Sequence, residues 1–143
     1  MKISILLPYK ENFSPIYAGA VSLFVKDTTK LSKYKQYITV YGNTKLKKIY
    51  KLNYKNIFLK KILVQSGSKV YVNQFLKYEK ENPSDIIERH NRPNYFHLIN
   101  VYKKNQKLVL YFHNDPLTMT GSRSTSDRKK LLENATKIIF NSH

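Results

Sequence analysis

The stretch Leu108-Val-Leu-Tyr-Phe-His113-Asn-Asp115-Pro116 decides how this chain is interpreted. Its first five residues are apolar or aromatic, a run typical of a strand covered on both faces of a parallel sheet. Pro116 has no amide proton and cannot extend the strand. Ligands of open α/β sheets bind just beyond the carboxyl ends of strands. The sequence therefore predicts His113 and Asp115 at a ligand-facing edge.

Strand and helix patterns alternate on both sides of this stretch. Besides the strand at 107–113, strands are expected at 2–7, 37–41, 85–90 and 137–140, with a short edge strand at 57–59. Helices are expected at 18–31, 69–81, 93–102 and 124–134. This order predicts an α/β fold with a doubly wound, mostly parallel, Rossmann-like sheet and helices on both faces.

Four serines are candidates for the N-caps of three helices. Ser14 precedes Pro15, an arrangement that favours the start of a helix. Ser66 or Ser68 would cap the helix expected at 69–81. Ser124 stands three residues before Asp127, which resembles a capping box.

Length and composition narrow the classes of function. The 143 residues suit one domain. Cysteine is absent, so disulfide frameworks and thiolate metal sites are excluded. No run approaches the roughly 18 apolar residues of a transmembrane helix, and no P-loop or nucleophile elbow occurs. His113 and Asp115 could share a metal, but no third ligand is evident, so we expect no metal.

The chain carries a net charge of +17, and 26 basic residues outnumber nine acidic ones. Most of the basic residues are lysines, whereas specific phosphate and base recognition usually favours arginine. A solvated lysine-rich surface is the simplest interpretation. The functional alternatives are a polyanionic substrate or peripheral contact with the anionic inner face of a membrane, ahead of nucleic acid.

The pattern resembles the N-terminal domain of a GT-B glycosyltransferase of the large retaining family often called group 1 or family 4. The segment Asp85-Ile-Ile-Glu-Arg-His90-Asn91-Arg92 resembles one of its strand ends, and Leu110-Tyr-Phe-His113-Asn-Asp115 resembles another. Lys137-Ile-Ile-Phe-Asn-Ser142 resembles its strand before the interdomain crossing. The resemblance covers nearly all of the chain, although many relatives have two adjacent glycines where this chain has Ala18-Gly19-Ala20.

The resemblance implies roles for particular residues. Ala18, Gly19 and Ala20 would let the backbone approach the diphosphate of a nucleotide sugar. His113 would face the donor sugar as the catalytic residue. The acceptor side of the cleft would be formed by Tyr17, Asn91, Arg92, Asp115 and Arg123. No metal or other cofactor is expected besides the nucleotide-sugar co-substrate, and the acceptor would be a glycan or lipid.

The last expected strand ends just before the sequence does, which predicts half of a two-domain protein. The missing C-terminal domain would bind the nucleotide, so residues 1–143 alone should transfer no sugar. The alternatives are a complete small α/β domain and, for function, a basic module that docks an anionic membrane or nucleic acid. The salt dependence of binding distinguishes a nucleic-acid-binding module from a sugar-binding domain. Affinity for nucleic acid falls steeply with salt concentration because binding releases counterions.

Several other side chains have simpler explanations. His90 ends a strand as His113 does, but the alternation of the strand could turn it into packing. Tyr9, Tyr17 and Tyr95 could stack on a sugar, although most of the 12 tyrosines must serve packing. Glu11 and Glu88 are single carboxylates, which are usually surface charges.

Overall fold

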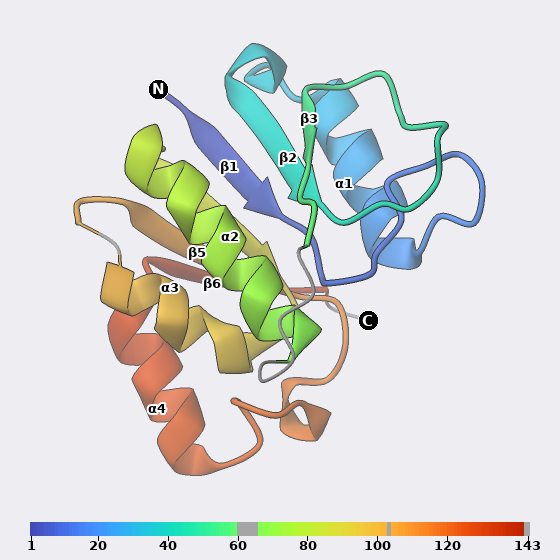
Figure 1. Cartoon of the computed structure of the whole chain (residues 1–143). Coiled ribbons are helices and arrows are strands. Elements are labelled where there is room, and N and C mark those ends of the chain that lie inside the picture. Colours follow the sequence, from blue (N-terminus) through green and yellow to red (C-terminus); the bar gives the residue numbers. More distant parts are fainter. Residues whose placement is uncertain (60–65, 103, 142–143) are drawn as a thin grey trace.

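The computed structural model describes residues 1–59, 66–102 and 104–141. Within them, a six-stranded sheet has the order β3-β2-β1-β4-β5-β6, and every neighbouring pair is parallel (Figure 1). The strands are β1 (Ile3–Leu6), β2 (Ile38–Gly42), β3 (Tyr54–Asn56), β4 (Ile86–His90), β5 (Lys107–Phe112) and β6 (Lys137–Phe140). The predicted doubly wound, Rossmann-like sheet is confirmed, and all of its strands are parallel rather than most.

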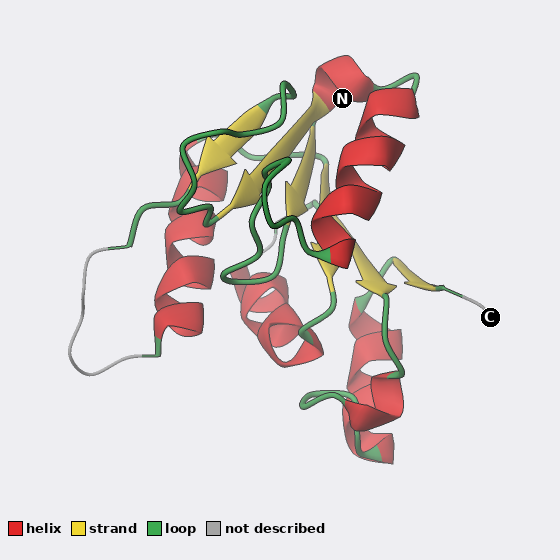
Figure 2. Ribbon diagram, turned by 90° about the vertical axis from the view of Figure 1, so that its right-hand side faces the viewer, coloured by secondary structure: helices red, strands yellow, loops and turns green. Residues whose placement is uncertain are grey.

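Helices lie on both sides of the twisted sheet (Figure 2). They are α1 (Ala20–Leu31), α2 (Gly67–Glu81), α3 (Phe96–Tyr102) and α4 (Thr125–Asn134). Helix α1 packs on one face, in a core with Ile5 of β1 and with Leu7, which directly follows that strand. The other three helices pack on the opposite face, where Leu6 and Ile87 are buried. Alternation along each strand therefore divides the apolar side chains between two cores.

Local capping signals set two of the helix starts. The Ser66 side chain accepts a hydrogen bond from the Lys69 amide at the start of α2. The Ser124 side chain accepts one from the Asp127 amide at the start of α4. The predicted cap at Ser14 is wrong, because its hydroxyl accepts from the Ile16 amide in a loop, and α1 begins only after Gly19.

The predicted edge strand at 57–59 is misplaced, since the observed strand β3 is Tyr54–Asn56. The ring of Tyr54 stacks on Phe13 at a centroid distance of 5.1 Å, and its hydroxyl hydrogen-bonds Thr44 and Asn56. These tertiary contacts select a polar segment for the strand over the more apolar Ile57-Phe58-Leu59. Phe58 is exposed.

Candidate functional site

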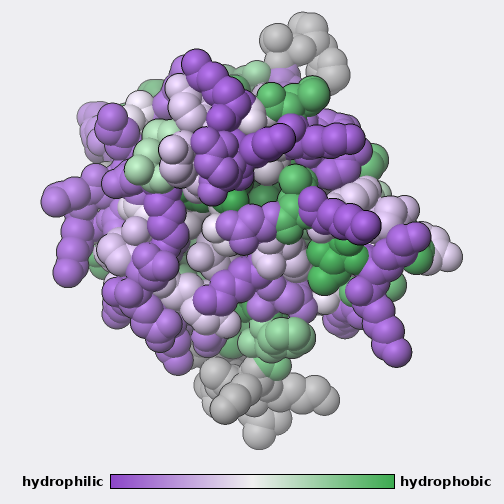
Figure 3. Space-filling view, turned by 90° about the horizontal axis from the view of Figure 1, so that it is seen from above, coloured by the Kyte–Doolittle hydropathy of each residue, from purple (hydrophilic) through white to green (hydrophobic). Residues whose placement is uncertain are grey.

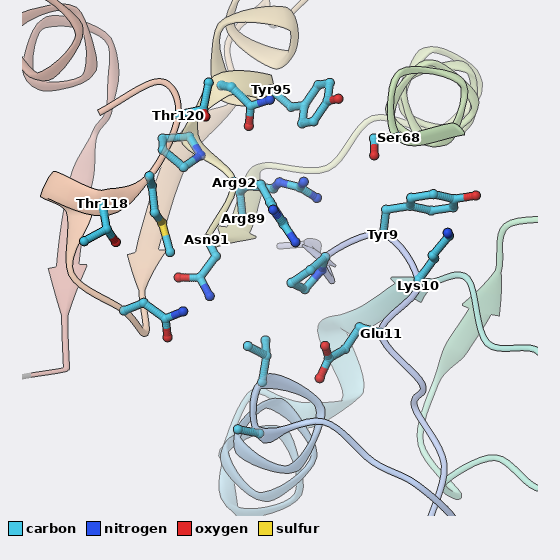
Figure 4. Close-up of a pocket in the computed structure, with 17 residues that line it drawn as sticks. Tyr9, Lys10, Glu11, Ser68, Arg89, Asn91, Arg92, Tyr95, Thr118 and Thr120 are labelled. Atoms are coloured by element: carbon cyan, nitrogen blue, oxygen red, sulfur yellow. The ribbon is translucent and has the colours of Figure 1, made fainter. Parts of the chain in front are cut away.

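A cavity of about 820 Å³ opens at the carboxyl ends of β1, β4 and β5 (Figure 4). Strands β1 and β4 are neighbours in the sheet although β2 and β3 separate them in sequence, so the strand order reverses here. Ligands of doubly wound sheets bind at this reversal. The polar side chains of its lining belong to Tyr9, Lys10, Glu11, Ser68, Arg89, Asn91, Arg92, Asn94, Tyr95, Asn114, Thr118 and Thr120.

Arg89 is a buried cation in the wall of this cavity. Only 1% of the residue is exposed, and its Nη1 donates to the Leu7 carbonyl at 3.0 Å. Its Nε has no hydrogen-bond partner. Among the described residues no carboxylate forms a salt bridge with it. Burial lowers the pKa of Arg89 to about 10, so the guanidinium remains charged at neutral pH.

Backbone strain is concentrated around the same cavity. Lys10, Asn91 and Arg92 have positive φ angles of 67°, 49° and 54° and all line the cavity. Left-handed conformations are costly for residues with a Cβ and persist where surrounding contacts enforce them. Two hydrogen bonds hold Asn91. Its backbone N–H donates to the Tyr111 carbonyl, and its side-chain Oδ1 accepts from the backbone N–H of His113 at 2.8 Å. The link joins the ends of β4 and β5.

The start of α1 is occupied by a carboxylate of the chain itself. Glu11 Oε1 accepts a hydrogen bond from the Ser22 amide at 3.1 Å. A Cβ on Gly19 would overlap the Glu11 carboxylate, so the glycine is needed for this close approach. The φ of Gly19 is −76°, which any residue can adopt. Glu11 therefore stands where the resemblance places the phosphate of a ligand, at the positive end of the helix.

Two histidines form a hydrogen-bonded chain on the α1 face of the sheet. Glu88 Oε1 lies 2.7 Å from His90 Nε2, and His90 Nδ1 lies 2.7 Å from His113 Nε2. The Asn141 amide nitrogen lies 3.1 Å from His113 Nδ1. An ionised Glu88 fixes the tautomers: His90 donates to it from Nε2, His113 donates to His90 from Nε2, and His113 Nδ1 is an acceptor.

The His113 ring is half-buried among other rings. It stacks on Tyr111 and His90 at centroid distances of 4.8 and 5.0 Å, and Phe24 of α1 meets it edge-on at 4.9 Å. Burial, with a smaller contribution from neighbouring His90, lowers the pKa of His113 to about 4. The ring is therefore neutral at physiological pH and can accept a hydrogen bond at Nδ1.

This depressed pKa predicts a loss of stability in mild acid. Unfolded His113 takes up a proton near pH 6.5 while the folded ring resists it until about pH 4, so the free energy of unfolding should fall as pH drops through that window. Because the ring is half-exposed and screened by solvent, we expect a loss of about 1–2 kcal/mol. Urea unfolding at pH 7.5, 6.5, 5.5 and 4.5, followed by circular dichroism, measures it.

His113→Gln keeps an N–H donor for His90 and removes the titrating ring, so its stability should vary less over this pH range. His97→Gln is the matched control and should keep the wild-type pH dependence. An unchanged pH dependence in His113→Gln would show that another group titrates.

The structure brings together some of the predicted site residues. Ala20, Asn91 and Arg92 line the cavity. The others lie outside its lining: His113, Ala18, Gly19, Tyr17, Asp115 and Arg123. Ser142 lies outside the described residues.

Two of the predicted site residues that lie outside the lining, Asp115 and Arg123, form hydrogen bonds within the loop after β5. The Asp115 carboxylate accepts from the Leu117 amide and caps a short 3-10 turn, Pro116–Thr118. Arg123 donates to the Thr118 carbonyl at 3.0 Å. Tyr17 is 84% exposed in the loop before α1. Asp115 and Arg123 thus shape the loop that carries Thr118 and Thr120 to the cavity wall.

Arg89 is one of the cavity residues that the sequence did not reveal. The strand Ile86-Ile-Glu-Arg-His90 contains a signal for it. Arg89 lies two residues after Ile87, so both side chains are on the same face of the strand, and Ile87 is a core residue. A charged residue on a core-facing position requires a partner, which marks it as a candidate.

Among the described residues, no three histidine or acidic side chains gather into a group that could hold a metal ion. The same residues contain no helix with the length and apolar character needed to span a bilayer. The chain matches no protein-family model, and no curated protein is significantly similar to it.

Proposed function

We propose that this chain is the acceptor-side, Rossmann-like domain of a GT-B glycosyltransferase, which transfers a sugar from a nucleotide-sugar donor to a glycan or lipid acceptor. The observation that supports this most is the polar cavity where the strand order reverses between β1 and β4. Its size is within the range of sites for small ligands. Its walls come from the loop after β1, the starts of α1 and α2, the end of β4 and the turns after β4 and β5.

The histidine chain suits a role beside a donor sugar. Nδ1 of His113 is an acceptor, paired with the Asn141 amide at 3.1 Å, and the ring is half-exposed. A sugar hydroxyl can take the place of that amide and donate to Nδ1. Glu88 and His90 hold the ring in this tautomer. The neutral His113 ring would therefore position the donor sugar by accepting a hydrogen bond from it. His90 and Glu88 are positioning residues in this proposal.

The donor nucleotide would be bound mainly by a second Rossmann-like domain of the enzyme. The domain described here would contact the diphosphate and sugar near the start of α1, after displacement of the Glu11 carboxylate from the Ser22 amide. Its own affinity for a nucleotide sugar is then weak, with a dissociation constant in the millimolar range, equivalent to about 4 kcal/mol of binding free energy.

A titration of the ¹⁵N-labelled chain with UDP-glucose and, separately, GDP-mannose tests this function. We expect saturable shifts of the backbone amide signals of Ala20, Ser22 and Asn114. Asn114→Ala should weaken binding about 2- to 10-fold, the effect of one lost hydrogen bond. Asn105→Ala, before the opposite end of β5, is the matched control and should bind as the wild type does.

The contrary result would be shifts spread over surface lysines that disappear between 50 and 200 mM salt, with Asn114→Ala and Asn105→Ala indistinguishable. That result would favour the basic binding module, because affinity that depends on phosphate neutralisation falls steeply with salt. Hydrophilic side chains cover most of the face seen in Figure 3, so non-specific anion contact has ample surface.

A further inference from the structure

We infer that the cavity contains a phosphate-binding subsite formed by Arg89, Arg92 and the amino-terminal turn of α2, and that its occupant is the phosphate monoester group of the ligand. The subsite stands on the geometry of the cavity alone. Assigning the phosphate to the sugar acceptor rests on the proposed function.

The first support is the state of Arg89. A buried charge is costly unless it is paired or hydrogen-bonded, and the usual partner of a buried arginine is a carboxylate or a phosphate. Only 1% of the surface of Arg89 is exposed. Its Nη1 donates to a backbone carbonyl, and its Nε has no hydrogen-bond partner. No carboxylate of the described chain pairs with it. Arg89 is therefore a buried cation at the cavity that has no carboxylate partner among the described residues.

The second support is the charge of the neighbouring lining. Arg92 and Lys10 are exposed and line the same cavity, and Figure 4 shows the side chains of Arg89 and Arg92 close together at its centre. The carboxylate of Glu11 also belongs to the lining but accepts from the Ser22 amide at the start of α1. Three cations and one carboxylate leave a local excess of positive charge, which a dianion neutralises better than a carboxylate does.

The third support is the direction of α2. This helix has 15 residues, and Ser68 in its first turn lines the cavity opposite Arg89 (Figure 4). The first N–H groups of a helix have no partner within the helix, and the dipole makes that end attractive to anions. Ser66 satisfies the amide of Lys69. The amides of Gly67 and Ser68 are then the donors that a phosphate oxygen would meet.

The backbone supports the same assignment. Asn91 and Arg92 are consecutive residues in the left-handed conformation, which turns the chain sharply after β4. Arg92 is exposed and lines the cavity, so the strained turn presents its side chain to the ligand site rather than to the core. Strain of this kind persists where function requires it.

Binding of inorganic phosphate to the ¹⁵N-labelled chain tests the subsite. We expect saturable shifts of the Gly67 and Ser68 amides. Arg92→Asn tolerates the left-handed backbone and should weaken phosphate binding about 5-fold or more. Arg89→Met, which retains length and apolar contacts, should weaken it at least 10-fold. Lys129→Ala removes one exposed charge from α4 and should stay within 2-fold of the wild type.

Equal weakening by Arg92→Asn and Lys129→Ala, or shifts absent from Gly67 and Ser68, would overturn the inference. Arg92→Asn carries this test even where Arg89→Met does not fold, since Arg92 is exposed. Acetate at the same concentrations should bind more weakly, and equal binding of acetate would refute the preference for phosphate.

Two phosphate monoesters then identify the source of the group. Glucose 1-phosphate represents a sugar phosphate, and dihexanoyl phosphatidic acid, used below its micelle concentration, represents a lipid phosphate. Tighter binding of either one at Gly67 and Ser68 supports the subsite and names its source. Phosphate bound here without a nucleotide-sugar response at Ala20 and Ser22 would retain the subsite and remove the proposed transferase, so the two failures are distinguishable.

Discussion

Replacement of Glu79 by alanine should lower the free energy of unfolding by about 3–5 kcal/mol. Glu79 is 5% exposed, and its carboxylate holds three donors at the amino ends of β1 and β4. Ser4 Oγ donates to Oε1 at 2.6 Å, and the amide and hydroxyl of Ser84 donate to Oε2 at 3.0 and 2.8 Å. Alanine leaves these buried groups without an acceptor, at about 1–3 kcal/mol each before relaxation.

Two variants separate this network from general effects of the helix. Glu79→Gln retains an oxygen for Ser84 and places an amide where the Ser4 hydroxyl can turn to accept, so we expect a loss of only about 1 kcal/mol. Glu81→Ala changes an exposed carboxylate at the end of the same helix and should shift stability by less than about 0.5 kcal/mol. The chain has no tryptophan, so urea unfolding is followed by circular dichroism. Equal losses for Glu79→Ala and Glu81→Ala would contradict the network.

Replacement of Gly121 by alanine should cost about 3 kcal/mol and deform one wall of the cavity. Gly121 has a φ of 93°, where an L side chain is strained. A Cβ there would also lie 2.5 Å from the Asn94 Cα, and backbone cannot give way as a side-chain tip can. Since Asn94, Thr118 and Thr120 all line the cavity, we expect weakened phosphate binding together with the stability loss.

Gly67→Ala is the matched control for the stability change alone. The added Cβ would lie 2.5 Å from the Tyr9 hydroxyl, which is the far end of a side chain that can move. Alanine is also favoured within a helix, so the net change in stability should be within about 1 kcal/mol. Circular dichroism during urea unfolding gives both values. A Gly121→Ala variant as stable as Gly67→Ala would show that the Asn94 turn adapts freely.

Local sequence signals predicted the scaffold well because they act over short distances. The run from Leu108 to Phe112 became a core strand of the sheet. Ser66 and Ser124 became caps, since each accepts from an amide three residues ahead. The signals failed where a distant contact decided the outcome. Strand β3 lies in a polar segment because Tyr54 stacks on the distant Phe13.

The candidate site shows the same division. The family resemblance places Asn91 and Arg92, after His90, on the acceptor side of a cleft, and both residues line the cavity. The pairing of His90 with His113 could not be predicted, because it depends on the register of β4 against β5. Nor could the position of Glu11 at the start of α1, which depends on the path of a loop.

The amino-acid sequence by itself determined the element order, the parallel α/β class and the polar character of the strand ends, because hydrophobic periodicity and capping are properties of neighbouring residues. The tertiary structure alone decided which of those polar groups meet. Arg89 donates to a carbonyl 82 positions away and meets the start of α2 at one cavity. Contacts at such separation arise only when the sheet aligns its strands, and they set both the charge and the shape of the site.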